Sequence, residues 1–233
     1  MTALTTIGFD ADDTLWHNES YFRLTQDRFA ELLADHAGRD HLEDRLLAAE
    51  RRNLGRYGFG VKGFTLSMIE TAVEVTGGLV SGAVVGEILA AGREMLARPV
   101  DLLPEAECAV RFARAAGLRL ILITKGDLLD QERKLAQSGL GEMFDAVEIV
   151  SDKSAQVYDR IFARHGDGAA RAMMVGNSLK SDVLPMLETG GWGVHVPYDV
   201  TWMLEHAEAP QGNARFHALG TLGDLSRLLE SLR

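Results

Sequence analysis

Three carboxylates stand close together in Asp10-Ala11-Asp12-Asp13-Thr14, directly after an apolar run that contains Leu4, Ile7 and Phe9. The run predicts a strand, so the acids would lie where that strand ends. Like-charged carboxylates in one site raise each other's pKa unless a cation offsets them. Such an arrangement suits an enzyme that needs a carboxylate nucleophile, a second carboxyl group for proton transfer and a divalent metal ion.

The sequence predicts later strands at 118–124, 146–150, 172–176 and 194–196, with an edge strand at 215–219. Polar residues gather where the first three of these strands end. Loops are often polar, and helices often begin with Ser or Asp. Polar segments at the ends of several successive strands favour a functional site instead, because ligands of parallel sheets bind outside the carboxyl ends of the strands. The segments are Thr124-Lys125-Gly126, Ser151-Asp152-Lys153 and Gly176-Asn177-Ser178, the last followed by Ser181-Asp182.

The elements that must position these residues alternate between strand and helix from Pro104 onward. This alternation predicts an α/β fold, a Rossmann-like parallel sheet with helices on both faces. Residues 18–98 show only helical spacing, with helices expected at 18–36, 40–54, 64–75 and 82–98. Asn18 and Ser81 are plausible N-caps of the first and the fourth of these helices. In the later part of the chain, one of the helices between strands is expected at 182–188. We therefore expect a core domain of residues 1–17 and 99–233, and an inserted all-helical cap domain of residues 18–98.

Composition limits the classes of function. The chain has 233 residues and a formal net charge of −10, which argues against a nucleic-acid scaffold. No apolar run approaches the roughly 20 residues that cross a bilayer. The N-terminus shows no secretion signal, and the single cysteine, Cys108, allows no intrachain disulfide. We expect a cytoplasmic protein with a small-molecule partner and a buried thiol at Cys108. The sequence does not indicate an oligomeric state.

The ordered set of motifs resembles the haloacid dehalogenase-like superfamily. The helical insert between the first and second motifs resembles the helical-cap class of that superfamily. The four motifs correspond to Asp10-Ala11-Asp12-Asp13-Thr14, Thr124, Lys153, and Gly176-Asn177-Ser178 with Ser181-Asp182.

The resemblance implies a role for each motif. Asp10 would attack phosphorus and form an aspartyl phosphate, while Asp12 would protonate the leaving group and later accept a proton from water. The Thr124 hydroxyl and the backbone N–H of Lys125 would bind phosphoryl oxygens, and Lys153 would neutralise developing charge. The cofactor would be Mg²⁺. Its ligands would come from Asp10, the backbone carbonyl of Asp12, Asn177 and Asp182.

The acid at position 12 favours phosphoryl transfer over dehalogenation, because a halide leaves without being protonated. The resulting prediction is a Mg²⁺-dependent phosphatase that hydrolyses a small phosphomonoester, with the cap closing over the site. The alternatives are a phosphomutase or phosphotransferase on the same core, a dehalogenase, and a non-catalytic binding protein.

The fourth motif departs from the pattern of the superfamily, which usually has Gly-Asp where this chain has Gly176-Asn177. A neutral amide oxygen can bind a hard cation, but it removes one negative charge from the site. Either Asn177 coordinates the metal with support from Asp182, or Asp182 carries more of the binding. Both alternatives predict weaker Mg²⁺ affinity than a Gly-Asp relative would have.

The segment 58–63, Gly-Phe-Gly-Val-Lys-Gly, matches the dinucleotide fingerprint G-x-G-x-x-G. We expect it to join two helices of the cap and to follow no strand, which argues against a nucleotide-cofactor site. Arg56, Tyr57 and Lys62 are candidates for contacting the substrate from this loop. The alternative is an ordinary inter-helix turn with solvated Arg and Lys side chains.

Overall fold

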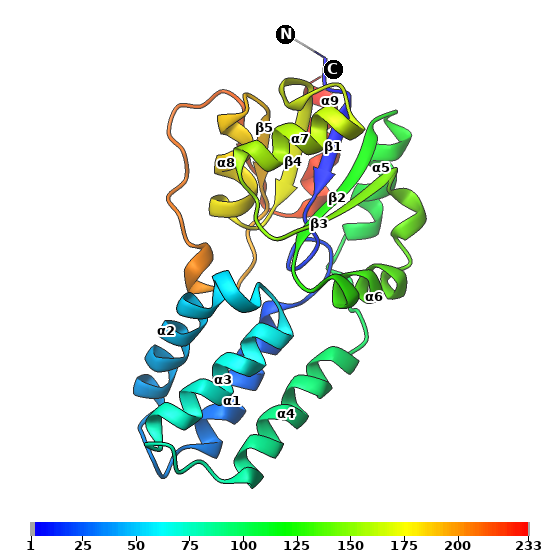
Figure 1. Ribbon diagram of the computed structural model, residues 1–233. Helices are drawn as coiled ribbons and strands as arrows, with labels where there is room; N and C mark the ends of the chain where they lie inside the picture. Colours follow the sequence, from blue (N-terminus) through cyan, green and yellow to red (C-terminus); the bar gives the residue numbers. More distant parts are fainter. Residues whose placement is uncertain (1–2, 233) are drawn as a thin grey trace. The chain divides into compact units, whose positions relative to one another are not determined.

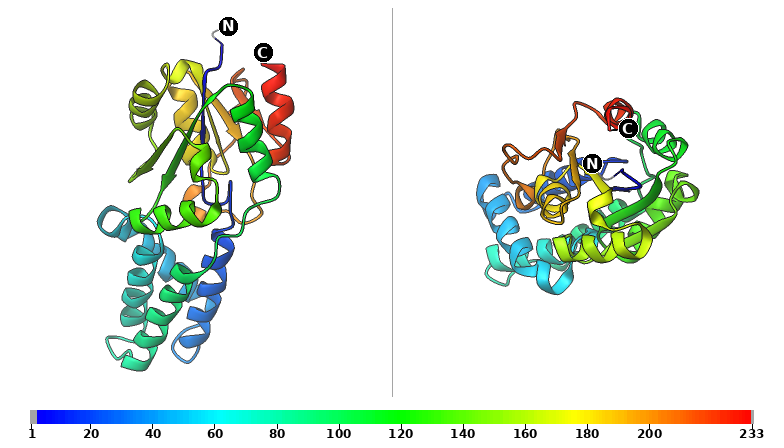
Figure 2. Two further views of the ribbon diagram at one scale, coloured as in Figure 1. Left: turned by 90° about the vertical axis from the view of Figure 1, so that its right-hand side faces the viewer. Right: turned by 90° about the horizontal axis from the view of Figure 1, so that it is seen from above.

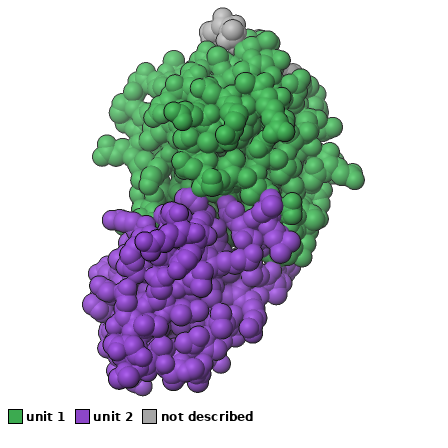
Figure 3. Space-filling model, in the orientation of Figure 1, with its two compact units in different colours: residues 1–19, 100–125, 131–233 green, residues 20–99, 126–130 purple. Residues whose placement is uncertain are grey.

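The computed structural model describes residues 3–232. They form two compact units, which Figure 3 shows in green and purple. The first unit contains the N-terminal segment up to Glu19, Val100–Lys125, and the chain from Gln131 onward. The second contains Ser20–Pro99 and the short segment Gly126–Asp130.

The first unit is built on a six-stranded parallel sheet in the order β3-β2-β1-β4-β5-β6 (Figure 1). In the centre of the sheet, Phe9 of β1 pairs with Leu122 of β2 on one side and with Val175 of β4 on the other. The apolar run of β2 is buried on both faces, as is usual for a central parallel strand. The strands are β1 Thr6–Phe9, β2 Arg119–Lys125, β3 Ala146–Val150, β4 Ala172–Gly176, β5 Trp192–His195 and β6 Phe216–Ala218.

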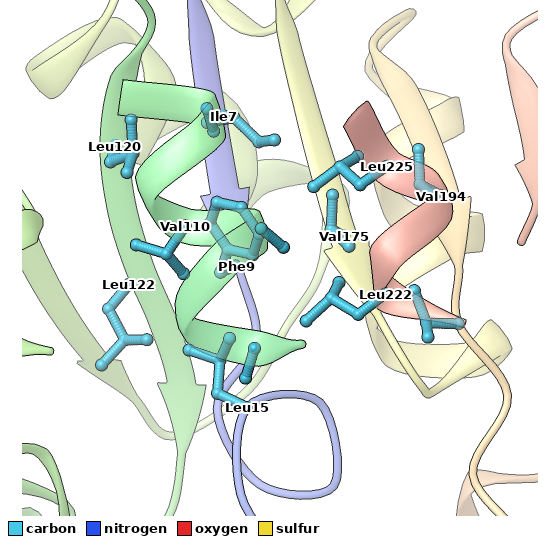
Figure 4. Close-up of a cluster of buried hydrophobic side chains, with 14 of the residues drawn as sticks. Ile7, Phe9, Leu15, Val110, Leu120, Leu122, Val175, Val194, Leu222 and Leu225 are labelled. Atoms are coloured by element: carbon cyan, nitrogen blue, oxygen red, sulfur yellow. The ribbon is translucent and has the colours of Figure 1, made fainter. Parts of the chain in front are cut away.

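Helices cover both faces of this sheet (Figure 2). On one face, α5 Ala106–Ala115 and α9 Leu225–Ser231 pack on alternate strand residues such as Ile7 and Phe9 (Figure 4). On the other face, α7 Ala155–His165 and α8 Leu184–Glu188 pack on Ile121, Ile123 and Met174. The period-2 alternation of side chains thus gives each sheet face its own core.

One glycine makes the second face close-packed. A Cβ on Gly8 of β1 would lie 3.0 Å from atoms of Ile123, Met174 and Phe162. Glycine therefore allows helix α7, which carries Phe162, to lie directly against the central strand.

The second unit contains α2 Arg39–Tyr57, α3 Val61–Val75, α4 Gly82–Ala97 and most of α1 Glu19–Leu32. Their apolar faces form one buried cluster that includes Phe29, Leu46 and Met68. The Ser81 side chain accepts a hydrogen bond from the backbone N–H of Val84 and so caps α4, as the sequence suggests. The remaining helix, α6 Leu128–Ser138, begins in the segment Gly126–Asp130 and continues into the first unit.

Two local expectations are wrong. The helix expected from Asp182 begins earlier, because a π-helical turn at Leu179–Val183 precedes α8. Cys108 is exposed on α5, not buried. This helix is short and amphipathic, and its buried positions are Ala106, Ala109, Val110 and Ala113, so Cys108 lies on the other side.

No helix among the described residues has the length and apolar character needed to cross a membrane.

Candidate active site

Residues that follow strands β1, β3 and β4 meet in a buried cluster. The Lys153 ammonium group, which follows β3, contacts a carboxylate oxygen of Asp10 after β1 and lies 2.7 Å from Asp182 Oδ1 after β4. The side chains of Asp10, Asp182 and Lys153 are almost inaccessible to solvent. The strands that position them are all parallel, so their carboxyl ends lie at one edge of the sheet.

The cluster changes the proton affinities of its members. Burial raises the pKa of Asp10 to about 7, an effect that Lys153 opposes and Asp182 increases. Burial alone would lower the pKa of Lys153, but the adjacent Asp10 and Asp182 carboxylates raise it overall. Lys153 is therefore a firmly protonated cation between two acids.

Thr14 links Asp10 to Asn177. The Thr14 hydroxyl has two acceptors within reach of its proton, Asp10 Oδ2 at 3.1 Å and Asn177 Oδ1 at 3.3 Å. Its oxygen accepts a hydrogen bond from the backbone N–H of Asn177 at 3.1 Å. A carboxylate oxygen and an amide oxygen thus converge on one hydroxyl group. Oxygens of these two kinds are ligands that Mg²⁺ accepts.

Asp182 is placed differently from Asn177. Its Oδ1 accepts from Lys153 at 2.7 Å, and its Oδ2 accepts from the backbone N–H of Ser178 at 3.0 Å. A Cβ on Gly176 would lie 2.2 Å from Asp182 Oδ2, so glycine is required where this carboxylate packs under the loop. Both oxygens of Asp182 already have donors, which favours the alternative in which Asn177 coordinates and Asp182 supports.

The carboxylate of Asp12 is held by three donors. Its Oδ1 accepts from Trp16 Nε1 at 2.7 Å and from Lys134 Nζ at 3.0 Å, and its Oδ2 accepts from Gln131 Nε2 at 2.8 Å. Sequence reasoning missed Gln131 and Lys134. Both lie on α6, the helix after the second motif, at a spacing of three residues that puts them on one helix face. That spacing is the only signal that could have indicated them.

Asp13 has a structural role. Its carboxylate accepts from the backbone N–H groups of Asn18 and Glu19 at the start of α1. The sequence suggests Asn18 as the cap of this helix, but Asp13 binds its first N–H groups instead. The left-handed backbone of Asp13, with φ of 61°, turns the chain toward them.

Thr124 and Lys125 end strand β2. The Thr124 side chain is buried, and its hydroxyl donates to the carbonyl oxygen of Lys125 at 3.2 Å. The Lys125 ammonium group lies 2.6 Å from Glu205 Oε1 and 2.8 Å from Ser181 Oγ. The phosphate-binding role predicted for Lys125 concerns its backbone N–H, and its side chain has these other partners.

A family model described as haloacid dehalogenase-like hydrolase matches residues 4–190. The chain belongs to this family. It is a haloacid dehalogenase-like hydrolase, as the four motifs suggest. No curated protein matches the sequence significantly.

Solved structures agree with this assignment. A haloacid dehalogenase-like hydrolase from Xanthomonas campestris is 38% identical, with a TM-score of 0.87 over 99% of this chain and 92% of that one. The hydrolase YfnB from Bacillus subtilis, bound to magnesium, is 14% identical with a TM-score of 0.67 over 98% of this chain and 99% of that one. The L-2-haloacid dehalogenase from Xanthobacter autotrophicus is 18% identical with a TM-score of 0.63 over 99% of this chain and 100% of that one. A phosphatase from Thermococcus onnurineus matches at a similar level, so these distant likenesses support the fold and leave the reaction open.

The three residues predicted as candidates for contacting the substrate, Arg56, Tyr57 and Lys62, lie in the second unit. Tyr57 Oη donates to Glu70 Oε1 at 2.8 Å, within the helical unit. Lys62 forms an ion pair of 2.9 Å with Asp127 in the segment Gly126–Asp130. Arg56, at the end of α2, has no ion pair among residues 3–232. Arg56 is exposed, and its contact with a substrate stays a prediction, whereas the polar groups of Tyr57 and Lys62 have protein partners.

The loop between α2 and α3 joins helices, as expected from the sequence. Gly58 and Gly60 have φ angles of 72° and 109°, which favour glycine. A Cβ on Gly60 would lie 3.2 Å from the backbone nitrogen of Asp127. These glycines allow a tight turn and a close approach to Asp127. The element directly before them is helix α2, whereas a dinucleotide site would require a strand there.

Proposed function

We propose that this hydrolase is a Mg²⁺-dependent phosphatase that hydrolyses a small phosphomonoester through an aspartyl phosphate on Asp10. The observation that carries the proposal is the second carboxyl group, Asp12, placed two residues after the nucleophile and directly beyond the end of β1. An alkoxide leaving group needs a proton donor, and a halide does not. Asp12 therefore favours a phosphatase over a dehalogenase.

The first step forms a bond between a carboxylate oxygen of Asp10 and phosphorus while the bond from phosphorus to the ester oxygen breaks. Asp12 donates a proton to that leaving oxygen. In the second step water attacks the same phosphorus, Asp12 accepts a proton from the water, and phosphate leaves. Asp10 is regenerated as a carboxylate, so the two carboxyl groups return to their starting states.

Three groups of this chain would stabilise the charge that develops on the phosphoryl oxygens. The Lys153 cation lies against Asp10 and is held there by Asp182. The Thr124 hydroxyl and the backbone N–H of Lys125 would supply further donors from the end of β2. Donors that are fixed in a water-poor site need little reorganisation during the reaction.

The residues present fit a magnesium ion. No group of three or more His, Cys, Asp or Glu side chains suited to a metal occurs among residues 3–232, so the proposed ligand set adds amide and carbonyl oxygens to a carboxylate. Asp10 Oδ2 and Asn177 Oδ1 are such neighbours around Thr14. The carbonyl oxygen of Asp12 accepts no hydrogen bond within the described chain, which suits a third ligand. A bound Mg²⁺ supplies positive charge that offsets the charges of Asp10 and the phosphoryl group.

A phosphomutase or phosphotransferase would use the same first step and pass the phosphoryl group to an acceptor other than water. The residues described above do not separate that reaction from hydrolysis. The substrate stays open among small phosphomonoesters such as sugar phosphates, nucleoside monophosphates and phosphorylated acids.

The experiment that tests the proposal is a screen of phosphorylated metabolites and p-nitrophenyl phosphate, with Mg²⁺ or with EDTA, in which released phosphate is measured. We expect Mg²⁺-dependent phosphate release that Asp10→Asn abolishes. Halide release from 2-haloacids without phosphate release would establish the dehalogenase instead. Phosphoryl transfer between sugars would establish the mutase, and no turnover of either class would leave the binding protein.

A further inference from the structure

A half-buried carboxylate from outside the four motifs contacts the candidate active site. The loop between β5 and β6, residues 196–215, is longer than most connections in compact domains. It is orange in Figure 1 and contains the short 3₁₀ turn Met203–Glu205. Glu205 at the end of this turn has a side chain that is only 17% exposed. None of the four motifs includes Glu205.

Both oxygens of Glu205 bind groups of the catalytic loops. Oε1 lies 2.6 Å from Lys125 Nζ, directly after the second motif. Oε2 accepts from the hydroxyl of Ser178 at 2.6 Å and from that of Ser181; Ser178 caps the π-helical turn Leu179–Val183, and Ser181 lies within it. Shielding an acid from water costs free energy unless the acid is paired, and both oxygens of Glu205 have partners.

The contacts define the direction of each hydrogen bond. Ser178 Oγ accepts the backbone N–H of Ser181 at 2.9 Å, so its own proton is given to Glu205. Ser181 Oγ accepts from Lys125 Nζ at 2.8 Å, so its proton is also given to Glu205. Glu205 must then be ionised, and burial, which would raise its pKa, is outweighed by Lys125 and the two serines, which lower it.

A continuous path leads from Glu205 to the nucleophile. Ser178, whose hydroxyl binds Glu205, donates its backbone N–H to Asp182 Oδ2 at 3.0 Å. Asp182 Oδ1 binds Lys153 at 2.7 Å, and Lys153 contacts Asp10. Asn177, the candidate metal ligand, directly precedes Ser178 in the sequence.

The loop has two more attachments to the same region. Lys180 Nζ donates to the carbonyl oxygen of Leu204 at 2.6 Å, next to Glu205. Tyr198 Oη lies 2.7 Å from His17 Nδ1, just after the first motif. The loop is therefore fixed to the segments that follow β1, β2 and β4.

We propose that Glu205 is a positioning residue, whose carboxylate fixes the turn from Asn177 to Asp182 through Ser178 and Ser181 and keeps the Lys125 side chain bound beside that turn. It touches neither the candidate nucleophile nor the acid. It acts by fixing the positions of the Asn177 amide, the candidate metal ligand, and of the Asp182–Lys153 pair relative to Asp10. The part of this inference that concerns Mg²⁺ and turnover rests on the proposed function, and the part that concerns the turn does not.

The test uses the full chain with Glu205→Gln and, as a matched control, Glu208→Gln, an exposed position on the same loop. Hydrogen exchange of the peptide that covers residues 176–183 is measured first, without metal or substrate. We expect faster exchange in Glu205→Gln and wild-type exchange in Glu208→Gln, because a neutral amide cannot accept from both serines and Lys125. Unchanged exchange in Glu205→Gln would overturn the inference.

Mg²⁺ affinity by calorimetry and steady-state turnover of p-nitrophenyl phosphate follow. Loss of a residue that orients metal ligands typically costs 10–100-fold in affinity or activity. We expect a loss of that size in Mg²⁺ affinity and in kcat, with a smaller change in KM. If the wild-type protein shows neither Mg²⁺ binding nor turnover, the proposed function fails while the exchange result still decides the role of Glu205.

A double variant, Glu205→Gln with Lys125→Met, separates positioning from charge balance. Glu205→Gln alone removes the carboxylate that pairs with the Lys125 cation at 2.6 Å, which destabilises the fold. The double variant removes that cation, so we expect the melting temperature to recover while exchange at 176–183 stays fast and Mg²⁺ affinity stays low. Recovery of wild-type exchange and affinity would mean that Glu205 only neutralises Lys125, and would overturn the positioning role.

Discussion

The contacts of Lys153 with the buried acids can be predicted from the sequence, whereas those of several other side chains cannot. A lysine after the third strand is expected near the acids of the first motif, and in the structure it binds both Asp10 and Asp182. The order of motifs along a parallel sheet is enough to predict this meeting. Gln131, Lys134 and Glu205 could not be predicted in the same way. Their contacts depend on the orientation of a helix face and on the path of a long loop, which no short motif encodes.

The amide at position 177 gives a prediction of its own. Asn177→Asp adds one negative charge at a candidate ligand, so Mg²⁺ should bind more tightly, on the order of tenfold. Calorimetry measures this directly. The control is Asn213→Asp, which adds the same charge at an exposed position of the β5–β6 loop. Unchanged or weaker affinity in Asn177→Asp would remove residue 177 from the ligand set.

Asp12 gives a second prediction. Asp12→Asn cannot donate or accept the proton, and an alkyl phosphate needs that proton far more than p-nitrophenyl phosphate does. We expect turnover of an alkyl phosphate to fall by about 10²–10⁴-fold and turnover of p-nitrophenyl phosphate to fall much less. Initial rates of phosphate release for both substrates measure this. Equal losses for the two substrates would contradict the role of Asp12 as acid.

The helices and strands follow the sequence where local signals are strong. The strands β3 Ala146–Val150 and β4 Ala172–Gly176 lie where the apolar runs predict them, and α4 begins after Ser81 as its capping chemistry predicts. The π-helical turn Leu179–Val183 was not predicted, because its geometry depends on Asp182 packing against Gly176. Tertiary contacts of this kind override local propensity.

Two glycines in α4 predict opposite effects on stability. Gly86→Ala meets no atom within 4 Å, so it should stabilise the fold by about 0.5–1 kcal/mol through helix propensity. A Cβ on Gly92 would lie 2.4 Å from Oγ1 of the buried Thr65 on α3, so Gly92→Ala should destabilise by about 1–3 kcal/mol. Urea unfolding of both variants tests the pair. A stabilising Gly92→Ala would show that α3 and α4 pack less closely than described.

For the chain as a whole, the main architectural expectation is confirmed. The alternation of strands and helices gives the parallel α/β sheet, and the residues between the first two strands of the sequence are mostly helical. Most of the second compact unit is the continuous stretch Ser20–Pro99, while the division into a core domain of residues 1–17 and 99–233 and a cap domain of residues 18–98 stays a prediction. The segment Gly126–Asp130 also groups with the second unit, through contacts such as Lys62 with Asp127. Such a contact between distant residues is not visible in a local pattern.

Metal binding should also be visible in the stability of the whole protein. A ligand that binds only the folded state stabilises it by about 2.7 kcal/mol at 100 times its Kd. We expect the melting temperature to rise with Mg²⁺ and to fall back with EDTA, and Asp10→Ala to lose most of this response. An equal rise in Asp10→Ala would place the bound metal elsewhere.

The central claim is that Asp10 carries the phosphoryl group during turnover. It is tested most directly by quenching the enzyme during turnover, reducing it with borohydride and sequencing the peptides by mass spectrometry, since borohydride converts an acyl phosphate into an alcohol. The account predicts homoserine at position 10, dependent on both substrate and Mg²⁺. A phosphatase that turns over normally with Asp10 unmodified, or with the modification at another residue, would contradict it.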